Sequence, residues 1–95
     1  MKVAVKYLGY LKKELGVEQE EHFTLKENAV MRDLLVLLAE KHSESFQKAV
    51  YEPNDAELKP HYIFSLNGLL HQSNSIETKL KDGDHVVFMP VVTGG

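Results

Sequence analysis

The sequence contains no cysteine and no tryptophan. Without thiols the protein cannot form disulfides, build a thiolate metal site or use a cysteine nucleophile. Its stability must therefore come from a hydrophobic core. A chain of 95 residues, of which 43% are hydrophobic, is long enough for one such core, because domains of this size bury roughly 60 to 70% of their unfolded surface. The length and composition predict a single domain.

Long apolar runs and a dominant charge are also missing. The longest apolar stretch, Leu34 to Ala39, is far shorter than the ~20 residues that cross a bilayer, and the N-terminal residues lack a signal-like apolar region. The net charge is -3, with both signs interspersed, so there is no basic surface for nucleic acid. These features predict a cytoplasmic protein that binds neither membranes nor nucleic acid directly.

The first quarter of the sequence predicts two strands separated by a short helix. Apolar side chains alternate in KVAVKYL, the period of a strand with one buried face, and they do so again in EEHFTLK: Val3, Val5, Tyr7, then Phe23 and Leu25. Between the strands, Leu11 and Leu15 lie four residues apart, as on one face of a helical turn, and Gly16 suits its C-terminal end.

The next segment predicts the main helix. Asn28 precedes AVMRDLLVLLAEKH and is a suitable N-cap, so the helix is expected from Ala29 to His42. The expected core-facing stripe follows helical spacing: Val30, Leu34, Leu37, Leu38 and Lys41. The residues that follow, SESFQKAVYE, are compatible with a further short helix, and the polar segment between Pro53 and Pro60 predicts an exposed loop.

The remaining sequence predicts a hairpin and a final strand. In HYIFSLNGLLH the pair Asn67-Gly68 favours a two-residue turn between strands. Ile76 and Leu80 are expected to anchor the following segment, before a tight turn at Asp82-Gly83. The last strand is expected from His85 to Met89, because proline at 90 has no amide for a sheet ladder.

This order of elements predicts an α+β domain with one main helix packed across one face of a mixed sheet, the β-grasp arrangement. The domain is expected to span residues 1–90, followed by a flexible tail at 91–95. Fully extended, five residues reach about 17 Å, enough to enter a pocket on another protein. Val91, Val92 and Thr93 favour an extended chain, and Gly94 and Gly95 lack the Cβ atoms that would block a narrow channel.

A glycine carboxylate at the tip of such a tail suits acyl activation. Adenylation by ATP would convert the carboxylate into a mixed anhydride, and sulfide would then give a thiocarboxylate, a nucleophilic sulfur donor. The sequence has no phosphate-binding loop of the G-x-x-x-x-G-K-[ST] type. The expectation is therefore a carrier and not an enzyme, with no bound cofactor and with ATP handled by an activating partner.

Three segments occur in an order and spacing that resemble a known family: LNG at 66–68, LKDGDHVVFMPVV at 80–92 and the closing GG. The sequence resembles the MoaD-like small subunit of molybdopterin synthase, a ubiquitin-like sulfur carrier related to the thiamin sulfur carrier. The resemblance implies a thiocarboxylate at Gly95, with Gly94 giving access. It also implies a sulfur donor, an adenylyltransferase like the ubiquitin-activating enzyme, and insertion of the tail into a larger synthase subunit.

Two other hypotheses stay open. The same activation could serve tRNA thiolation or conjugation to protein lysines, as in ubiquitin-like modifiers. Alternatively, the domain could be a β-grasp interaction module without covalent chemistry.

The partner-binding residues are expected at the last strand and the tail. Neighbouring side chains on a strand face opposite ways, so Val86 and Phe88 oppose Val87 and Met89, and either pair could be exposed for docking. The predicted partner-binding set is Phe88, Pro90, Val91, Val92 and Thr93.

The histidines and the aspartates at 82 and 84 are candidates for a metal or acid-base site, but a structural role is predicted for them. The five histidines lack a helical ligand spacing and are expected to be exposed, so no metal site is predicted. Asp82 and Asp84 are interpreted as turn residues and not as acid-base groups.

Overall fold

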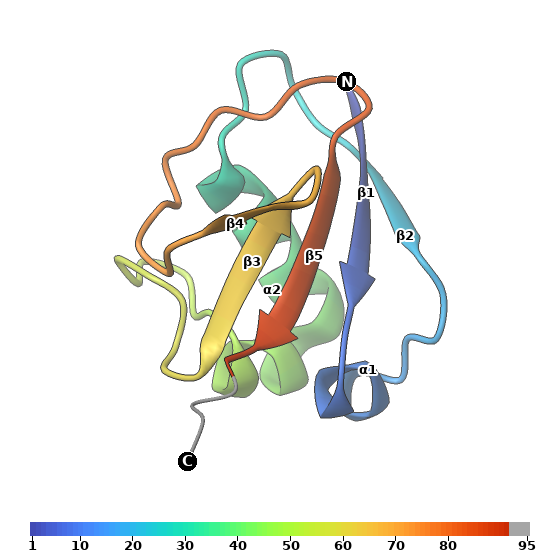
Figure 1. The fold of residues 1–95 in the computed structure, drawn as a ribbon, viewed down its shortest axis with the longest axis vertical. Coiled ribbons are helices and arrows are strands. Elements are labelled where there is room, and N and C mark those ends of the chain that lie inside the picture. The colour runs from blue at the N-terminus through green and yellow to red at the C-terminus, as the bar shows by residue number, and fades with distance from the viewer. Residues whose placement is uncertain (92–95) are drawn as a thin grey trace.

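A sheet of five strands forms the centre of the protein. The computed structural model describes residues 1–91, with β1 (Lys2–Tyr7), β2 (Glu21–Thr24), β3 (Tyr62–Leu66), β4 (Leu69–His71) and β5 (His85–Pro90). The strand order is β2-β1-β5-β3-β4, with β1 and β5 parallel and the other pairs antiparallel (Figure 1). Helix α1 (Tyr10–Leu15) follows β1, and α2 (Met31–Ala49) crosses one face of the sheet. The predicted mixed sheet with one main helix is confirmed.

The core lies between α2 and the sheet, as the alternation in the first strand predicts. Val3, Val5 and Tyr7 are at most 1% exposed. They pack with Val86 and Phe88 of β5 and with the apolar face of α2. Burial of this kind contributes about 25 cal/mol per Å² of apolar surface, which makes this cluster the main source of stability.

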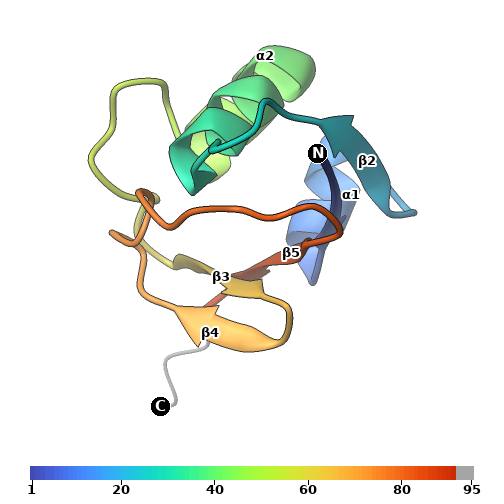
Figure 2. The ribbon, with the colours of Figure 1, turned by 90° about the horizontal axis from the view of Figure 1, so that it is seen from above.

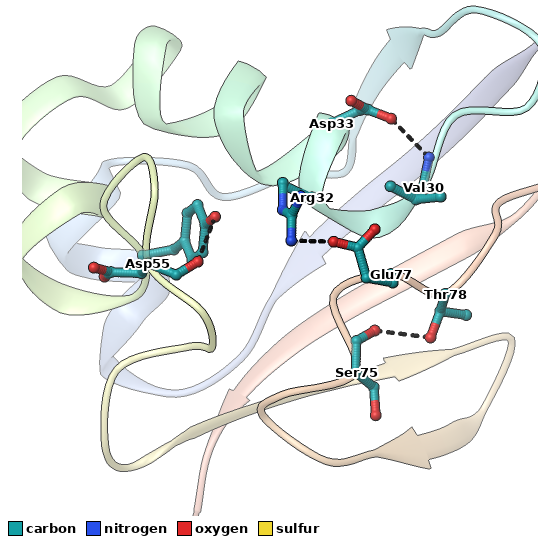
Figure 3. Close-up of polar contacts among 8 residues, drawn as sticks. Val30, Arg32, Asp33, Asp55, Ser75, Glu77 and Thr78 are labelled. Carbon is teal, nitrogen blue, oxygen red and sulfur yellow. Dashed lines mark hydrogen bonds and ion pairs between the residues drawn. The ribbon is translucent and has the colours of Figure 1, made fainter.

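Helix α2 begins two residues later than predicted, and Asn28 is not its N-cap. Asn28 has a positive φ of 67° in the preceding turn, and Val30 occupies the cap position. The Val30 amide donates to the Asp33 carboxylate over 2.8 Å (Figure 3). The backbone amides of Met31 and Arg32 donate to the carbonyl oxygens of Thr78 and Ile76. Because a distant segment supplies these acceptors, the helix needs no side-chain cap at position 28.

The same connecting segment is held to the helix by side chains. Arg32 forms an ion pair with Glu77 beside the Ser75–Thr78 turn (Figure 3). Ile76 and Leu80 are buried, as predicted.

The predicted core stripe of the helix is partly wrong. The buried positions are Met31, Leu34, Leu35, Leu38, Ala39 and Phe46, whereas Leu37 is only half-buried and Lys41 is exposed. In LLVLLA nearly every position is apolar, so several stripes fit helical spacing equally well. The contact with the sheet decides which face is buried.

The possible second helix is present as the last part of α2. Ser43 interrupts the helix with φ 50° and ψ -128°, and the helical turns after it place Phe46 in the core. The Gln47 side chain donates to the Ala39 carbonyl across the interruption. The loop between Pro53 and Pro60 is exposed except at Leu58, which is 2% exposed, and at the half-buried Asp55 and Lys59.

Two predicted turns are confirmed and are linked to each other. Asn67 and Gly68 have φ values of 51° and 86°, as a two-residue hairpin requires. The Asn67 side-chain amide donates through Nδ2 to Asp84 Oδ1, and Asn67 Oδ1 accepts from the His85 backbone amide. Asp84 also accepts from the Lys81 amide, and Asp82 accepts from the Lys2 amide. Both aspartates therefore serve the turn before β5, as predicted.

Within residues 1–91, the helices are too short or too polar to cross a membrane.

Candidate functional site

The last strand delivers the chain to one end of the sheet, beside α1 (Figure 1). Pro90 is still part of β5, opposite Tyr62 of β3, and the Val91 amide donates to the His61 carbonyl over 2.6 Å. The prediction that pairing stops at Pro90 is therefore wrong on the β3 side. In this antiparallel pair Val91 supplies the donor, so the missing proline amide removes no bond to β3.

The predicted acyl site and most of the tail lie outside the described residues. These are Val92, Thr93, Gly94 and Gly95. Their roles and the domain boundary at residue 90 remain predictions. Of the predicted partner-binding residues that the structure describes, Pro90 is half-buried and Val91 is 37% exposed.

Phe88 does not belong to the docking surface. Its side chain is fully buried, stacked on Tyr7 with ring centroids 6.0 Å apart and in edge contact with Phe46. The strand alternation leaves Val87 and Met89, which are half-buried, on the other face. The sequence left open which pair of β5 side chains is exposed. In the structure Val87 and Met89 face outward, and Val86 and Phe88 are buried.

An apolar patch covers the tail-proximal part of the sheet face opposite α2. Figure 2 shows α2 on one side of the sheet, and within residues 1–91 no helix crosses the other side, here called the outer face. The strand registers place Ile63 opposite Met89 and Ser65 opposite both Val87 and Leu70. The outer patch consists of Leu8, Ile63, Leu70, Val87 and Met89, of which Leu8 is 41% and Leu70 61% exposed.

Three members of the outer patch were not predicted from the sequence: Leu8, Ile63 and Leu70. Leu8 is in phase with the exposed Lys6 and not with the buried Tyr7, so the period-2 pattern already places it on the outer face. Ile63 and Leu70 could not be assigned in this way, because their faces depend on the pairing of β3 with β5 and β4.

A polar cluster around Glu21 lies on the α2 side of the sheet. Glu21 Oε1 accepts from the Tyr7 hydroxyl over 2.8 Å and contacts His42 Nε2 at 2.9 Å, while Oε2 contacts Lys41 Nζ at 2.7 Å. Burial alone would raise the pKa of Glu21, but the hydrogen bonds from Lys41, His42 and Tyr7 hold that pKa below its ordinary value. Burial, followed by the bond to Glu21, raises the pKa of Tyr7 well above its ordinary value.

This cluster corrects the prediction that all five histidines are exposed. The side chain of His42 is only 9% exposed, whereas His22 and His85 are 71% and 63% exposed. The cluster links β1, β2 and α2 through these side-chain contacts. Within residues 1–91, no group of three or more acidic or histidine side chains is arranged to hold a metal ion.

The sequence of this chain matches a known protein family. The sequence matches the ThiS family over residues 5–95, nearly its whole length. The chain belongs to the ThiS family. This family consists of ubiquitin-like sulfur carriers, and the predicted β-grasp fold is confirmed. A search of the curated proteins gave no significant match.

Several solved structures are similar to this chain. SAMP1 from Haloferax volcanii has the same fold, with a TM-score of 0.80, 22% identity and full coverage of both chains. Molybdopterin converting factor subunit 1 from Pyrococcus furiosus has a TM-score of 0.71 and 31% identity, covering 97% of this chain and 99% of that one.

A third similar structure is a protein-protein complex. It contains subunits 1 and 2 of the molybdopterin-converting factor from Helicobacter pylori 26695, and the matching chain has a TM-score of 0.64, 25% identity and full coverage of both chains.

Proposed function

We propose that this protein carries sulfur as a thiocarboxylate on Gly95 and acts as the small subunit of a molybdopterin synthase. The observation that carries the proposal is the outer patch, which adjoins the end of β5 where the chain leaves the sheet. An exposed apolar surface next to a Gly-Gly tail suits a protein that docks on an enzyme and inserts its tail. The family match extends to Gly95, which supports the same assignment.

The activation chemistry requires a partner that binds ATP. A carboxylate oxygen of Gly95 attacks the α-phosphorus of ATP, and pyrophosphate leaves. Sulfide then attacks the acyl carbon, the bond to the phosphate oxygen breaks, and AMP leaves. The product is a thiocarboxylate and no oxidation has occurred. The proposed partners for this activation are an adenylyltransferase of the ubiquitin-activating type and a sulfide donor.

The proposed acceptor enzyme is the large subunit of the synthase. We propose that both partners use the outer patch in turn, so that the activating enzyme must leave before the large subunit can bind. Similarity to the subunit 1 of Pyrococcus furiosus and to the Helicobacter pylori complex supports this choice. Within the synthase, the thiocarboxylate of Gly95 would supply the sulfur of the molybdopterin dithiolene.

The proposal is tested by the intact mass of the protein after incubation with ATP, sulfide and the adenylyltransferase of the same organism. We expect a shift equal to the replacement of one oxygen by sulfur, which requires ATP and disappears when Gly95 is deleted. The circular dichroism spectrum of the deletion variant should equal that of the wild type, because the buried core is formed by residues between Val3 and Phe88.

Two outcomes would contradict the proposal. An unchanged mass with an enzyme that is demonstrably active on another carrier would favour an interaction module without covalent chemistry. Gly-Gly remnants on the lysines of other proteins, without sulfur delivery to the molybdopterin precursor, would identify a protein modifier instead.

A further inference from the structure

Gly9 and Pro90 are in closer contact than a larger residue at position 9 would allow. Gly9 has φ 67° and ψ -151°, a backbone conformation that is open almost only to glycine. A Cβ atom placed on Gly9 would lie 3.2 Å from Pro90 Cγ and 3.4 Å from Cδ. The ring of Pro90 therefore packs directly on the backbone of residue 9.

Besides this contact, backbone hydrogen bonds hold the end of β5 to the neighbouring strand on each side. On the β1 side, the Leu8 amide donates to the Phe88 carbonyl over 3.0 Å. On the β3 side, the Val91 amide donates to the His61 carbonyl over 2.6 Å. We call Gly9, Tyr10, His61 and Tyr62 the tail-exit residues.

The aromatic pair among the tail-exit residues spans the end of β5. Tyr10 follows β1 and Tyr62 begins β3, and β5 lies between these two strands in the sheet. Nevertheless their ring centroids are only 6.3 Å apart, in an edge-to-face arrangement. The two rings thus meet across the strand end that carries Pro90. Gly9 and Tyr10, at the start of α1, and His61 and Tyr62, at the start of β3, thus flank the end of β5.

We propose that Gly9 is a positioning residue for the acyl site: its backbone seats Pro90, and this contact sets the direction in which the tail leaves the domain. The inference rests on the proposed function, since it assigns a role in presenting Gly95 to the adenylyltransferase. It adds a residue outside the tail and outside the outer patch.

The position of the exit sets how far the tail can reach. A tail drawn into a channel of the partner must be extended there, and five residues reach at most about 17 Å, so a displacement of Pro90 moves the carboxylate away from the partner's catalytic centre by a similar distance. A misplacement of about 1 Å can lower a reaction rate on the order of a hundredfold. Docking through the outer patch is expected to change little, because Val87 and Met89 stay paired with Ser65 and Ile63 of β3.

The experiment is a double-mutant cycle at the contact, assayed by pyrophosphate exchange with the adenylyltransferase. Gly9→Ala should lower kcat about tenfold or more while KM stays within about twofold of the wild type. In the Pro90→Ala background, which lacks the ring atoms Cγ and Cδ, adding Gly9→Ala should change kcat by less than about threefold.

Gly16→Ala is the control for adding a methyl group at a positive-φ glycine that has no contact with Pro90. Gly16 lies at the other end of α1 with a positive φ of 69°, but a Cβ there would meet nothing within 4 Å. Both variants lose some stability through strain, so all assays are run where circular dichroism shows each variant folded. Gly16→Ala should retain the wild-type kcat and KM.

Amide hydrogen exchange of Val91 gives a second readout that needs no partner enzyme. Faster exchange in Gly9→Ala than in Gly16→Ala is expected, because a displaced Pro90 weakens the bond from Val91 to His61. Should Gly9→Ala not fold, Pro90→Ala alone must still lower kcat at constant KM.

The inference is overturned if Gly9→Ala behaves like Gly16→Ala, or if its effect on kcat is the same with and without the Pro90 ring. In either case a wild-type protein that is still adenylated leaves the proposed function intact. A wild-type protein that is not adenylated would instead contradict the proposed function itself.

Discussion

The carboxylate of Glu21 is the clearest case of a single residue whose environment the fold creates. Tyr7 from β1 and Lys41 and His42 from α2 all reach this one side chain from distant parts of the sequence. The side chain is only 9% exposed, so an ionised carboxylate there depends on these partners. No sequence pattern indicates such a cluster, because its members are brought together only by the packing of α2 on the sheet.

Glu21→Gln is expected to lower the free energy of unfolding by about 1 to 3 kcal/mol at pH 7, since it weakens hydrogen bonds to a charged, buried group. The loss should shrink with acid. The pKa of Glu21 is lowered in the folded state, so the contribution of the carboxylate is present at neutral pH and disappears as pH falls through that folded-state pKa. Urea unfolding at pH 7 and near pH 3 measures both values.

Glu20→Gln provides the matched control. Glu20 is the neighbouring residue, is more exposed, and contacts only exposed histidines at 3.7 Å. Its replacement should change the stability by less than about 0.5 kcal/mol at either pH. An equal loss in the two variants at pH 7 would show that the cluster contributes nothing specific.

At the scale of elements, α2 shows where periodicity succeeds and where it stops. A helix after residue 28 was predicted correctly, but its first residue, its buried stripe and its interruption at Ser43 were not. The amides of its first turn bond to residues 76 and 78, and the sheet chooses its buried face. These are contacts between segments that lie far apart in sequence, so a local pattern cannot contain them.

Ser43→Gly is expected to stabilise the protein by about 1 kcal/mol. Ser43 has φ 50° and ψ -128°, a region that costs a residue with a Cβ on the order of 1 to 3 kcal/mol and glycine far less. Part of the gain is offset by the greater freedom of glycine in the unfolded chain. Thermal or urea unfolding gives the difference.

Ser45→Gly is the comparison for this substitution. Ser45 is exposed and helical within the same α2, so glycine there should cost about 0.5 to 1 kcal/mol. Stabilisation by both changes, or by neither, would mean that Ser43 is not strained.

For the whole molecule, the decisive feature is the difference between the two faces of the sheet. One face is covered by α2 and forms the core (Figure 2). The other face presents the outer patch next to the end of β5. A partner docked on the outer patch would therefore lie close to residue 91, where the described chain ends.

Leu8→Asp should raise KM for the adenylyltransferase about tenfold or more while leaving kcat nearly unchanged, because a charge in an apolar interface opposes docking but not chemistry. The fold should persist, since Leu8 is 41% exposed. This pattern is the reverse of that expected for Gly9→Ala. Pyrophosphate exchange kinetics distinguish the two.

Leu69→Asp introduces the same charge at a leucine outside the patch. Leu69 is 67% exposed and pairs with Leu66, whose side of the sheet faces α2. Its KM should stay within about twofold of the wild type. If Leu69→Asp impairs docking as much as Leu8→Asp, the outer patch is not the interface.

The sequence by itself determined the fold class, the strands, the hairpin at Asn67-Gly68 and the family, because alternation, turn residues and terminal motifs are local in the chain. It also pointed to Gly95 as the acyl site, to Gly94 as the access residue and to residues 90–93 as partner-binding residues, predictions that stand untested. Only the tertiary structure decided that Phe88 is core and that Val87 and Met89 face outward. It alone brought Gly9 against Pro90 and Glu21 against His42. Such choices depend on which surfaces meet after the strands have paired, and that information is not present in any one segment.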